Sequence, residues 1–182
     1  PNDTKILFTN TAANGVELWV IDVASAQAKK LTEANLNANL GAPFSWFGDN
    51  ETILVKLLPS NRKPLLDSKK DLPAGPIISN ASGAKSQNRT YPDMLKNKND
   101  EINFENIITS ELYKITLSGN KTLFKSADMF AGQSLSPDGN YIMITTIQKP
   151  FSYIVPLNRF PMKSVVYDKS GREVKIVNET PL

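Results

Sequence analysis

Residues 134–144, Ser-Leu-Ser-Pro-Asp-Gly-Asn-Tyr-Ile-Met-Ile, constrain the fold more than any other stretch of the chain. Pro137 presets φ for the first turn position, Asp138 can hydrogen-bond to nearby backbone, and Gly139 accepts a positive φ. The apolar and β-branched residues that follow suit a buried strand. Residues 44–55 repeat this pattern around a Gly-Asp-Asn turn. Two copies of a strand-turn-strand unit predict a β-propeller or another repetitive β fold.

Three further strand-turn-strand pairs support that interpretation, at residues 17–32, 111–124 and 164–176. The outer strand of each pair is short and carries Lys, which discourages pairing between sheet edges. The last two pairs begin about 50 residues apart, which is close to the usual blade period. The predicted fold class is all-β, a partial β-propeller of about two to three four-stranded antiparallel blades.

A long insertion explains why the first two pairs lie about twice as far apart as the last two. The predicted blade units cover about residues 1–33, 43–126 and 131–178, with an insertion at about residues 59–106 that is rich in Pro, Asn, Lys and Ser. We expect this insertion to be partly helical, with one helical turn at 91–96, where Pro92 stands early. Residues 100–105 are expected to form another turn or a strand.

Composition excludes several kinds of chemistry. The 182 residues include no His and no Cys, so this sequence holds no Ser-His-Asp triad, cysteine nucleophile or disulfide, and nearly every zinc site is excluded. The acidic group at 93–105 lacks the Gly-containing loop of a calcium site, and we expect a solvated surface there. We therefore predict no catalytic residue, no metal and no cofactor in this chain.

Charge and hydropathy also limit the partners. The net charge of +3 is spread along the chain, whereas nucleic-acid binding favours a clustered basic stripe, so no nucleic-acid partner is expected. No apolar run approaches the ~18 residues of a membrane span. Residues 1–9 match the second half of the turn unit, which predicts that the chain begins inside a blade and is an excerpt of a longer polypeptide.

Four proline-rich segments carry a resemblance to a known family: Leu72–Pro76, Arg89–Leu95, Pro150–Pro156 and Arg159–Pro161. With the opening repeat, they resemble the propeller of the prolyl oligopeptidase family of serine peptidases. The resemblance is to its glutamyl-endopeptidase-like or dipeptidyl-aminopeptidase-like branch. Members of that family pair a propeller with a C-terminal α/β-hydrolase domain that carries a Gly-x-Ser-x-Gly elbow followed by Asp and His. Gly132–Ser136 lacks the second Gly of such an elbow, and the hydrolase domain is absent from this sequence.

The resemblance implies a non-catalytic propeller segment that gates and positions peptide substrates for a hydrolase domain outside this sequence. Its implied partners are peptides, the missing hydrolase domain and, through open sheet edges, further copies of itself. The implied location is periplasmic or secreted. The alternative is a stand-alone periplasmic binding or scaffold propeller, like those of the Tol system. The sequence that follows Leu182 discriminates the two, because only the peptidase continues into a nucleophile elbow.

Three residues are candidates for binding a substrate: Arg159, Tyr153 and Arg89. Arg159 stands between Pro156 and Pro161, which restrain the backbone on both sides. A restrained guanidinium is suited to bidentate capture of a carboxylate, either an acidic side chain or a peptide terminus. The alternative for Arg159 is a structural ion pair on the blade edge. Tyr153 is expected to help anchor Arg159, and Arg89 belongs to the insertion that could fold over the cavity between domains.

Overall fold

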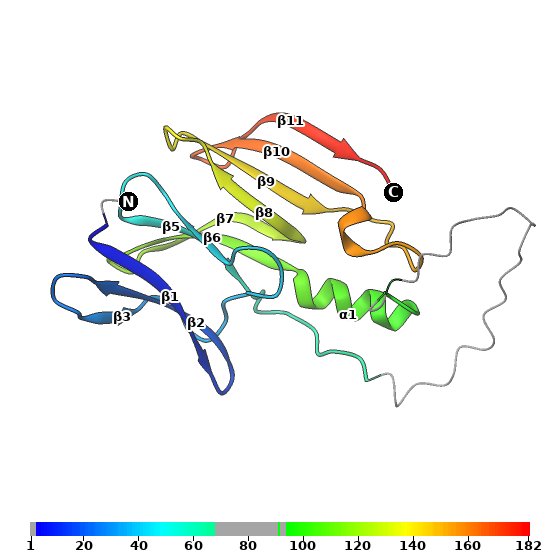
Figure 1. The fold of residues 1–182 in the computed structure, drawn as a ribbon, viewed down its shortest axis with the longest axis horizontal. Helices are drawn as coiled ribbons and strands as arrows, with labels where there is room; N and C mark the ends of the chain where they lie inside the picture. The colour runs from blue at the N-terminus through cyan, green and yellow to red at the C-terminus, as the bar shows by residue number, and fades with distance from the viewer. Residues whose placement is uncertain (1–2, 68–90, 92–93) are drawn as a thin grey trace, which may run out of the picture.

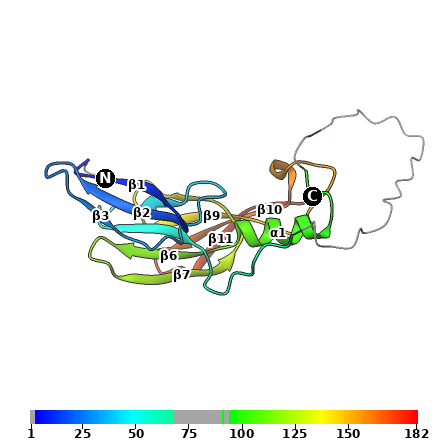
Figure 2. The ribbon, with the colours of Figure 1, turned by 90° about the horizontal axis from the view of Figure 1, so that it is seen from below.

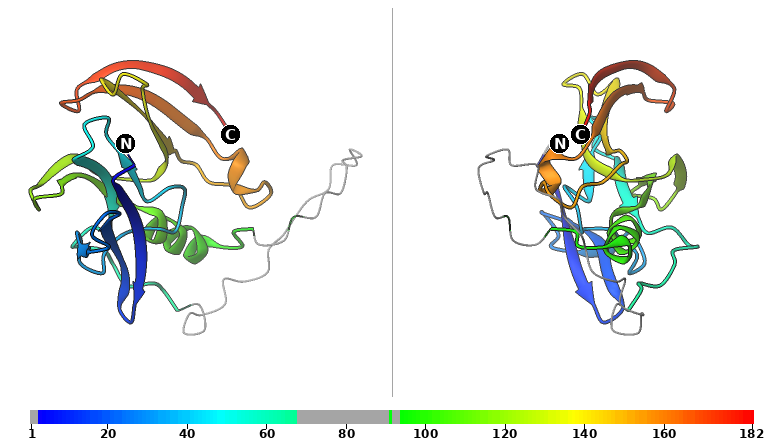
Figure 3. Two further views of the ribbon diagram at one scale, coloured as in Figure 1. Left: turned by 60° about the vertical axis from the view of Figure 1, so that its left-hand side comes forward. Right: turned by 90° about the vertical axis from the view of Figure 1, so that its right-hand side faces the viewer.

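The computed structural model describes residues 3–67, 91 and 94–182, and these residues form three antiparallel sheets. Their strand orders are β1-β2-β3, β4-β5-β6-β7 and β11-β10-β9-β8. The strands are β1 (Lys5–Ala12), β2 (Gly15–Asp22), β3 (Ala28–Lys30), β4 (Phe44–Trp46), β5 (Thr52–Leu57), β6 (Ser110–Thr116), β7 (Lys121–Asp128), β8 (Phe130–Leu135), β9 (Tyr141–Ile147), β10 (Met162–Asp168) and β11 (Glu173–Thr180). The sheets follow one another around an open arc (Figures 1 and 3). The predicted fold class, a partial propeller, is confirmed.

The two predicted turns are built by the same local chemistry. Between β8 and β9, Gly139 has a φ of 65°, and the Asp138 carboxylate accepts a hydrogen bond from the Ser136 hydroxyl at 2.5 Å. This bond, together with those from Asn140, lowers the pKa of Asp138 to about 2. Between β4 and β5, Asp49 accepts two backbone N–H bonds at 3.0 and 2.8 Å. Asp138 is therefore a turn-forming residue, as the sequence predicted.

The strand β5 lies between two hydrophobic cores and is buried on both faces. Ile53, Val55 and Leu57 pack with Leu18 in the core between the first and second sheets. Leu54 packs with other buried residues in the core between the second and third sheets. Alternate residues of a strand point to opposite faces, so an uninterrupted apolar run is what a doubly covered strand requires.

A third core lies where the long connections of the second and third sheets meet. The helix α1 (Lys98–Ile108) belongs to the connection between β5 and β6, and the short 3₁₀ helix η2 (Leu157–Arg159) belongs to the connection between β9 and β10. Figure 2 shows both at the same end of the molecule. They bury a cluster of apolar side chains between them: Ile108, Met129, Ile147, Phe151 and Phe160.

Polar residues define both ends of α1. Asn97 is the N-cap, and its side chain accepts the N–H of Asp100 at 2.9 Å. At the other end, the buried Asn37 amide donates to the Ile107 and Thr109 carbonyls at 3.0 and 3.1 Å. These carbonyls have no partner inside the helix, so Asn37 satisfies them and ties the helix to the chain that precedes β4.

The helix differs from the prediction in its limits. The expected helical turn at 91–96 is not formed by residues 94–96, and residues 92–93 lie outside the described residues. The reason is the cap: Asn97 itself is extended, with φ −158° and ψ 177°, so the helix begins only after it. Residues 100–105, expected as a turn or strand, are the middle of α1. Over the described ranges, no helix combines the length and apolarity needed to cross a membrane.

Apolar side chains are exposed at both ends of the arc. On the first sheet, Leu7 packs into the core, so its neighbours Ile6 and Phe8 face the opposite side, where they are 56% and 37% exposed. On the third sheet, Tyr141 and Met143 are similarly exposed, at 44% and 39%. In Figure 3 the first and third sheets lie at opposite ends of the arc. Each end therefore presents a sheet face that no described residue covers.

Candidate functional site

The connection between β9 and β10 is held rigidly at its base by three aromatic rings. Phe151 and Phe160 stack with centroids 5.6 Å apart, and Phe104 of α1 meets both edge-on at 5.1 and 5.8 Å. The connection closes where the Gln148 N–H donates to the Pro161 carbonyl at 2.7 Å. The proline-rich loop is thus a packed element of the fold.

Arg159 ends η2 and lies at the surface of this loop. The turn is closed by its own N–H, which donates to the Pro156 carbonyl at 2.9 Å. The side chain is exposed and lines a groove of about 740 Å³ with Ser164, Asn178 and other residues of β9, β10 and the β11 end. No carboxylate among the described residues forms an ion pair with Arg159, so the blade-edge pair is not seen in that part of the chain.

A second hollow of about 810 Å³ continues the first toward the inner strand β8. Both are lined by Thr145, Pro156, Asn158 and Met162, so they form one continuous groove, called the loop groove below. Its floor near β8 includes two pairs of neighbouring residues, Leu40–Gly41 and Ala131–Gly132. Among the described residues that line the loop groove, Arg159 is the one charged side chain.

The other two candidate residues lie elsewhere. Tyr153 is 41% exposed, does not line the loop groove, and faces Glu101 of α1. Partial burial and that carboxylate raise the pKa of the Tyr153 hydroxyl. Phe151 and Phe160 therefore anchor the loop that carries Arg159, while Tyr153 joins the loop to α1. Arg89 lies outside the described residues.

Lys56 is a feature of the site that the sequence analysis did not single out. It is the one charged residue of β5, it is 2% exposed, and its ammonium donates to the Leu40 carbonyl of the loop-groove floor. Burial lowers the pKa of Lys56 to about 8. The signal in the sequence was a lone Lys inside the apolar run Thr-Ile-Leu-Val-Lys-Leu.

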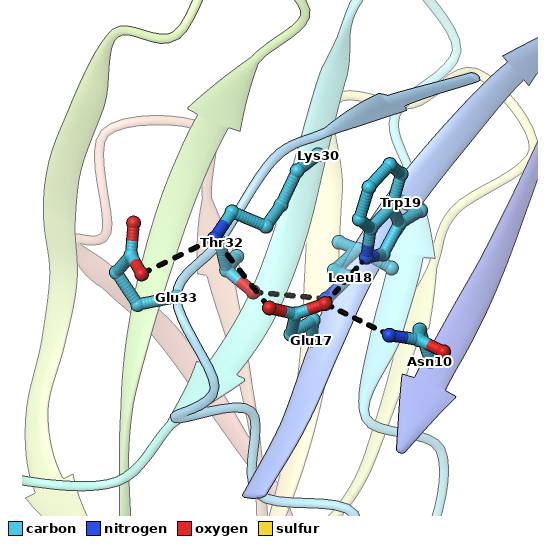
Figure 4. Close-up of polar contacts among 7 residues, drawn as sticks. All are labelled: Asn10, Glu17, Leu18, Trp19, Lys30, Thr32 and Glu33. Atoms are coloured by element: carbon cyan, nitrogen blue, oxygen red, sulfur yellow. Dashed lines mark hydrogen bonds and ion pairs between the residues drawn. The ribbon is translucent and has the colours of Figure 1, made fainter. Parts of the chain in front are cut away.

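A polar cluster on the first sheet is structural. In Figure 4 the Glu17 carboxylate accepts hydrogen bonds from the Asn10 amide at 3.0 Å, from the Trp19 indole at 2.8 Å and from Lys30 at 3.4 Å. The bonds from Asn10 and Trp19 contribute most to lowering the pKa of Glu17. The donors come from all three strands of the sheet, so the cluster ties the sheet together. The described residues hold no group of acidic side chains placed to bind a metal.

Comparison with known proteins gives two clear relatives. The chain is 34% identical over 171 residues to a probable chloroplastic glutamyl endopeptidase of Oryza sativa subsp. japonica, covering 92% of this chain and 18% of that protein. It is 33% identical over 174 residues to the corresponding Arabidopsis thaliana protein, covering 91% and 17%. The chain thus spans about a fifth of the length of these relatives. No family model matches the chain.

Solved structures show the same fold at low identity. The acylaminoacyl peptidase of Pyrococcus horikoshii matches 98% of this chain and 24% of its own, with a TM-score of 0.56 and 17% identity. TolB from Acinetobacter baumannii matches 100% of this chain and 31% of its own, with a TM-score of 0.52 and 14% identity.

The fold therefore defines an arc of β-propeller blades, with its long connections gathered on one face. Within that class, the chain is similar along nearly its whole length to the two endopeptidases. These relatives and the shared fold support a propeller segment of the prolyl oligopeptidase family.

Proposed function

We propose that this chain is the non-catalytic propeller segment of a serine peptidase, in which it gates and positions peptide substrates for an α/β-hydrolase domain outside this sequence. The observation that carries the proposal is the loop groove, a hollow on the face where the long connections converge, with a single charged side chain at its wall among the residues that the structure describes. The names of the two relatives support peptide substrates and a hydrolase partner.

Arg159 is proposed to receive a carboxylate of the bound peptide. Its loop is fixed by the packed rings of Phe151 and Phe160, its backbone by η2, and its guanidinium is left without an acidic partner among the described residues. A fixed backbone leaves less freedom to be lost when the side chain binds, which favours bidentate recognition of a carboxylate. Tyr153 and Arg89 stay predictions as substrate-binding residues: Tyr153 faces Glu101, and Arg89 lies outside the described residues.

The alternative, a scaffold propeller like those of the Tol system, shares the fold. The likeness to TolB is a likeness of fold alone at 14% identity, whereas the endopeptidase relatives are 34% and 33% identical. The sequence identity therefore favours the peptidase. A periplasmic or secreted location stays a prediction, and the two relatives are named as chloroplastic.

The proposal is tested by substituting Arg159 in the full-length protein. Arg159→Ala and Arg159→Lys are expected to lower kcat/KM for a Glu-containing peptide by about 1–3 kcal/mol, which is about 5- to 150-fold, and to affect the matched Gln peptide much less. Arg172→Ala is a control, because Arg172 is an exposed Arg in the β10–β11 turn of the third sheet, where it pairs with Asp168 at 3.0 Å. An equal loss for both peptides together with a lower Tm would show that Arg159 is structural.

A further inference from the structure

Lys56 occupies a position in β5 where the fold otherwise places apolar side chains. Alternation along the strand puts it on the same face as Leu54, toward the third sheet. Its side chain is 2% exposed, and no carboxylate of the described residues forms an ion pair with it. An unpaired buried ammonium disfavours folding, so a Met at this position would suit the core better.

The ammonium of Lys56 lies directly under the loop groove. It donates to the Leu40 carbonyl, and Leu40 and Gly41 both line the groove. A methyl group added at Gly41 would lie 3.8 Å from Lys56 Nζ and 2.4 Å from the Ala131 carbonyl oxygen. Backbone alone therefore separates the charge from the groove at this point. Beside it, a methyl group added at Gly132 would meet nothing within 4 Å, so the groove is open there.

The charged side chains at the loop groove, among the described residues, are both positive. Arg159 lines one part and Lys56 lies beneath the other, while no acidic side chain of the described residues lines either part. The path from Lys56 to the groove runs through buried protein, where a charge is screened much less than in water. A negatively charged group in the groove would therefore experience both positive charges.

We infer that Lys56 is a specificity-determining residue of the loop groove, which favours a carboxylate-bearing peptide through its buried positive charge. This inference rests on the proposed function, since it assumes that peptides enter the groove. Lys56 acts with Arg159 but differently: Arg159 contacts the carboxylate, whereas Lys56 sets the potential of the floor from below. Its substitution should lower kcat/KM for Glu peptides more than for the matched Gln peptides.

The test uses Lys56→Met and Lys56→Gln in the full-length protein at pH 7, with peptides that differ only by Glu or Gln. Both variants are expected to reduce the Glu-over-Gln ratio of kcat/KM by about fivefold to tenfold, the effect of one unit charge acting through a partly protein path. Cleavage of the Gln peptide is expected to change much less than cleavage of the Glu peptide, and the Tm of Lys56→Met is expected to equal or exceed that of wild type.

Lys114→Met is the matched control. Lys114 is a partly buried lysine of the neighbouring strand β6, but it lies over the rings of Phe47 and Phe124 and lines a hollow with the β4–β5 and β8–β9 turns, away from the loop groove. Its substitution should leave the Glu-over-Gln ratio unchanged.

Several results would overturn the inference. These are an unchanged ratio in the Lys56 variants, an equal loss for both peptides, the same change of ratio in Lys114→Met, or failure of both Lys56 variants to fold.

If the wild-type protein cleaves neither peptide, the proposed function fails by itself. Calorimetric binding of the same two peptides then tests Lys56: a Glu preference that the variants lose supports the inference, and its absence in wild type overturns it.

Discussion

Three aspartates perform the same task in different turns of this chain. Asp49, Asp138 and Asp168 each accept hydrogen bonds from donors within their own turn, and these bonds lower the pKa of Asp138 and of Asp168 to about 2. Their carboxylates are occupied by local donors, so they are structural residues. The repeated units therefore share the same turn hydrogen bonds as well as a similar sequence.

At the residue scale, the buried Lys56 leads to a prediction of how the free energy of unfolding depends on pH. Its folded pKa is about 8, below the value of about 10.4 for an unfolded lysine. Between these values the unfolded chain binds more protons, so folding stability rises with pH, by on the order of 3 kcal/mol in total. Below pH 8 the full penalty for burying the charge remains.

We therefore expect Lys56→Met to be more stable than wild type at pH 7 in urea unfolding of this chain. That advantage should shrink by roughly 1 kcal/mol per pH unit between pH 8 and 10. Each comparison is made at one pH against wild type, so contributions from other titrating groups cancel. A stability difference that stays constant from pH 7 to 10 would contradict the prediction.

At the scale of elements, α1 and the β9–β10 connection depend on each other. Phe104 of the helix packs edge-on against both stacked rings of the connection, and Lys149 of the connection forms an ion pair with Glu105 at 2.7 Å. A helix of 11 residues is marginal by itself in water, so this packing supplies most of its stability.

Phe104→Ala is expected to remove about 2–4 kcal/mol of local stability, because it removes the ring that packs edge-on against both stacked rings and leaves a cavity there. Hydrogen exchange should then show faster exchange of amides in both α1 and the connection, with β5 little changed. The control is Phe8→Ala, a half-exposed aromatic residue on the first sheet, which should leave α1 protection as it is. Faster exchange confined to α1 would show that the two elements are independent.

At the scale of the whole molecule, the arc is open. In the first sheet β1 is an edge strand, whereas β4 and β8 are the corresponding inner edges of the other two sheets. Unpaired edges and uncovered apolar faces favour association between copies.

We predict that this chain self-associates through the first-sheet end of the arc. Sedimentation velocity is expected to show concentration-dependent association of wild type, and the double variant Ile6→Lys with Phe8→Lys should sediment as a monomer. Leu123→Lys is the control, since Leu123 is 51% exposed but belongs to β7, at the outer edge of the second sheet. Equal association of the double variant and wild type would place the contact elsewhere.

Local sequence signals were sufficient for the turns and for the class of fold. Pro137, Asp138 and Gly139 determine a turn through φ preferences and short-range hydrogen bonds, which do not depend on the rest of the chain. The limits of α1 were not predictable in the same way. Apolar Ile102 and Phe104 alternate as in a strand, and the helix is favoured by the Asn97 cap and by contacts with a connection about 50 residues away.

The sequence by itself determined the repeated strand-turn-strand units, the lack of a catalytic triad and the backbone restraint by the prolines near Arg159, because each depends on residue chemistry within a few positions. Only the tertiary structure decided what surrounds those residues. It placed Tyr153 against Glu101 instead of at the groove, and it brought Lys56 beneath Gly41. The physical reason is that burial and electrostatic environment arise from elements that are distant in the sequence, and no local pattern specifies which of them will meet.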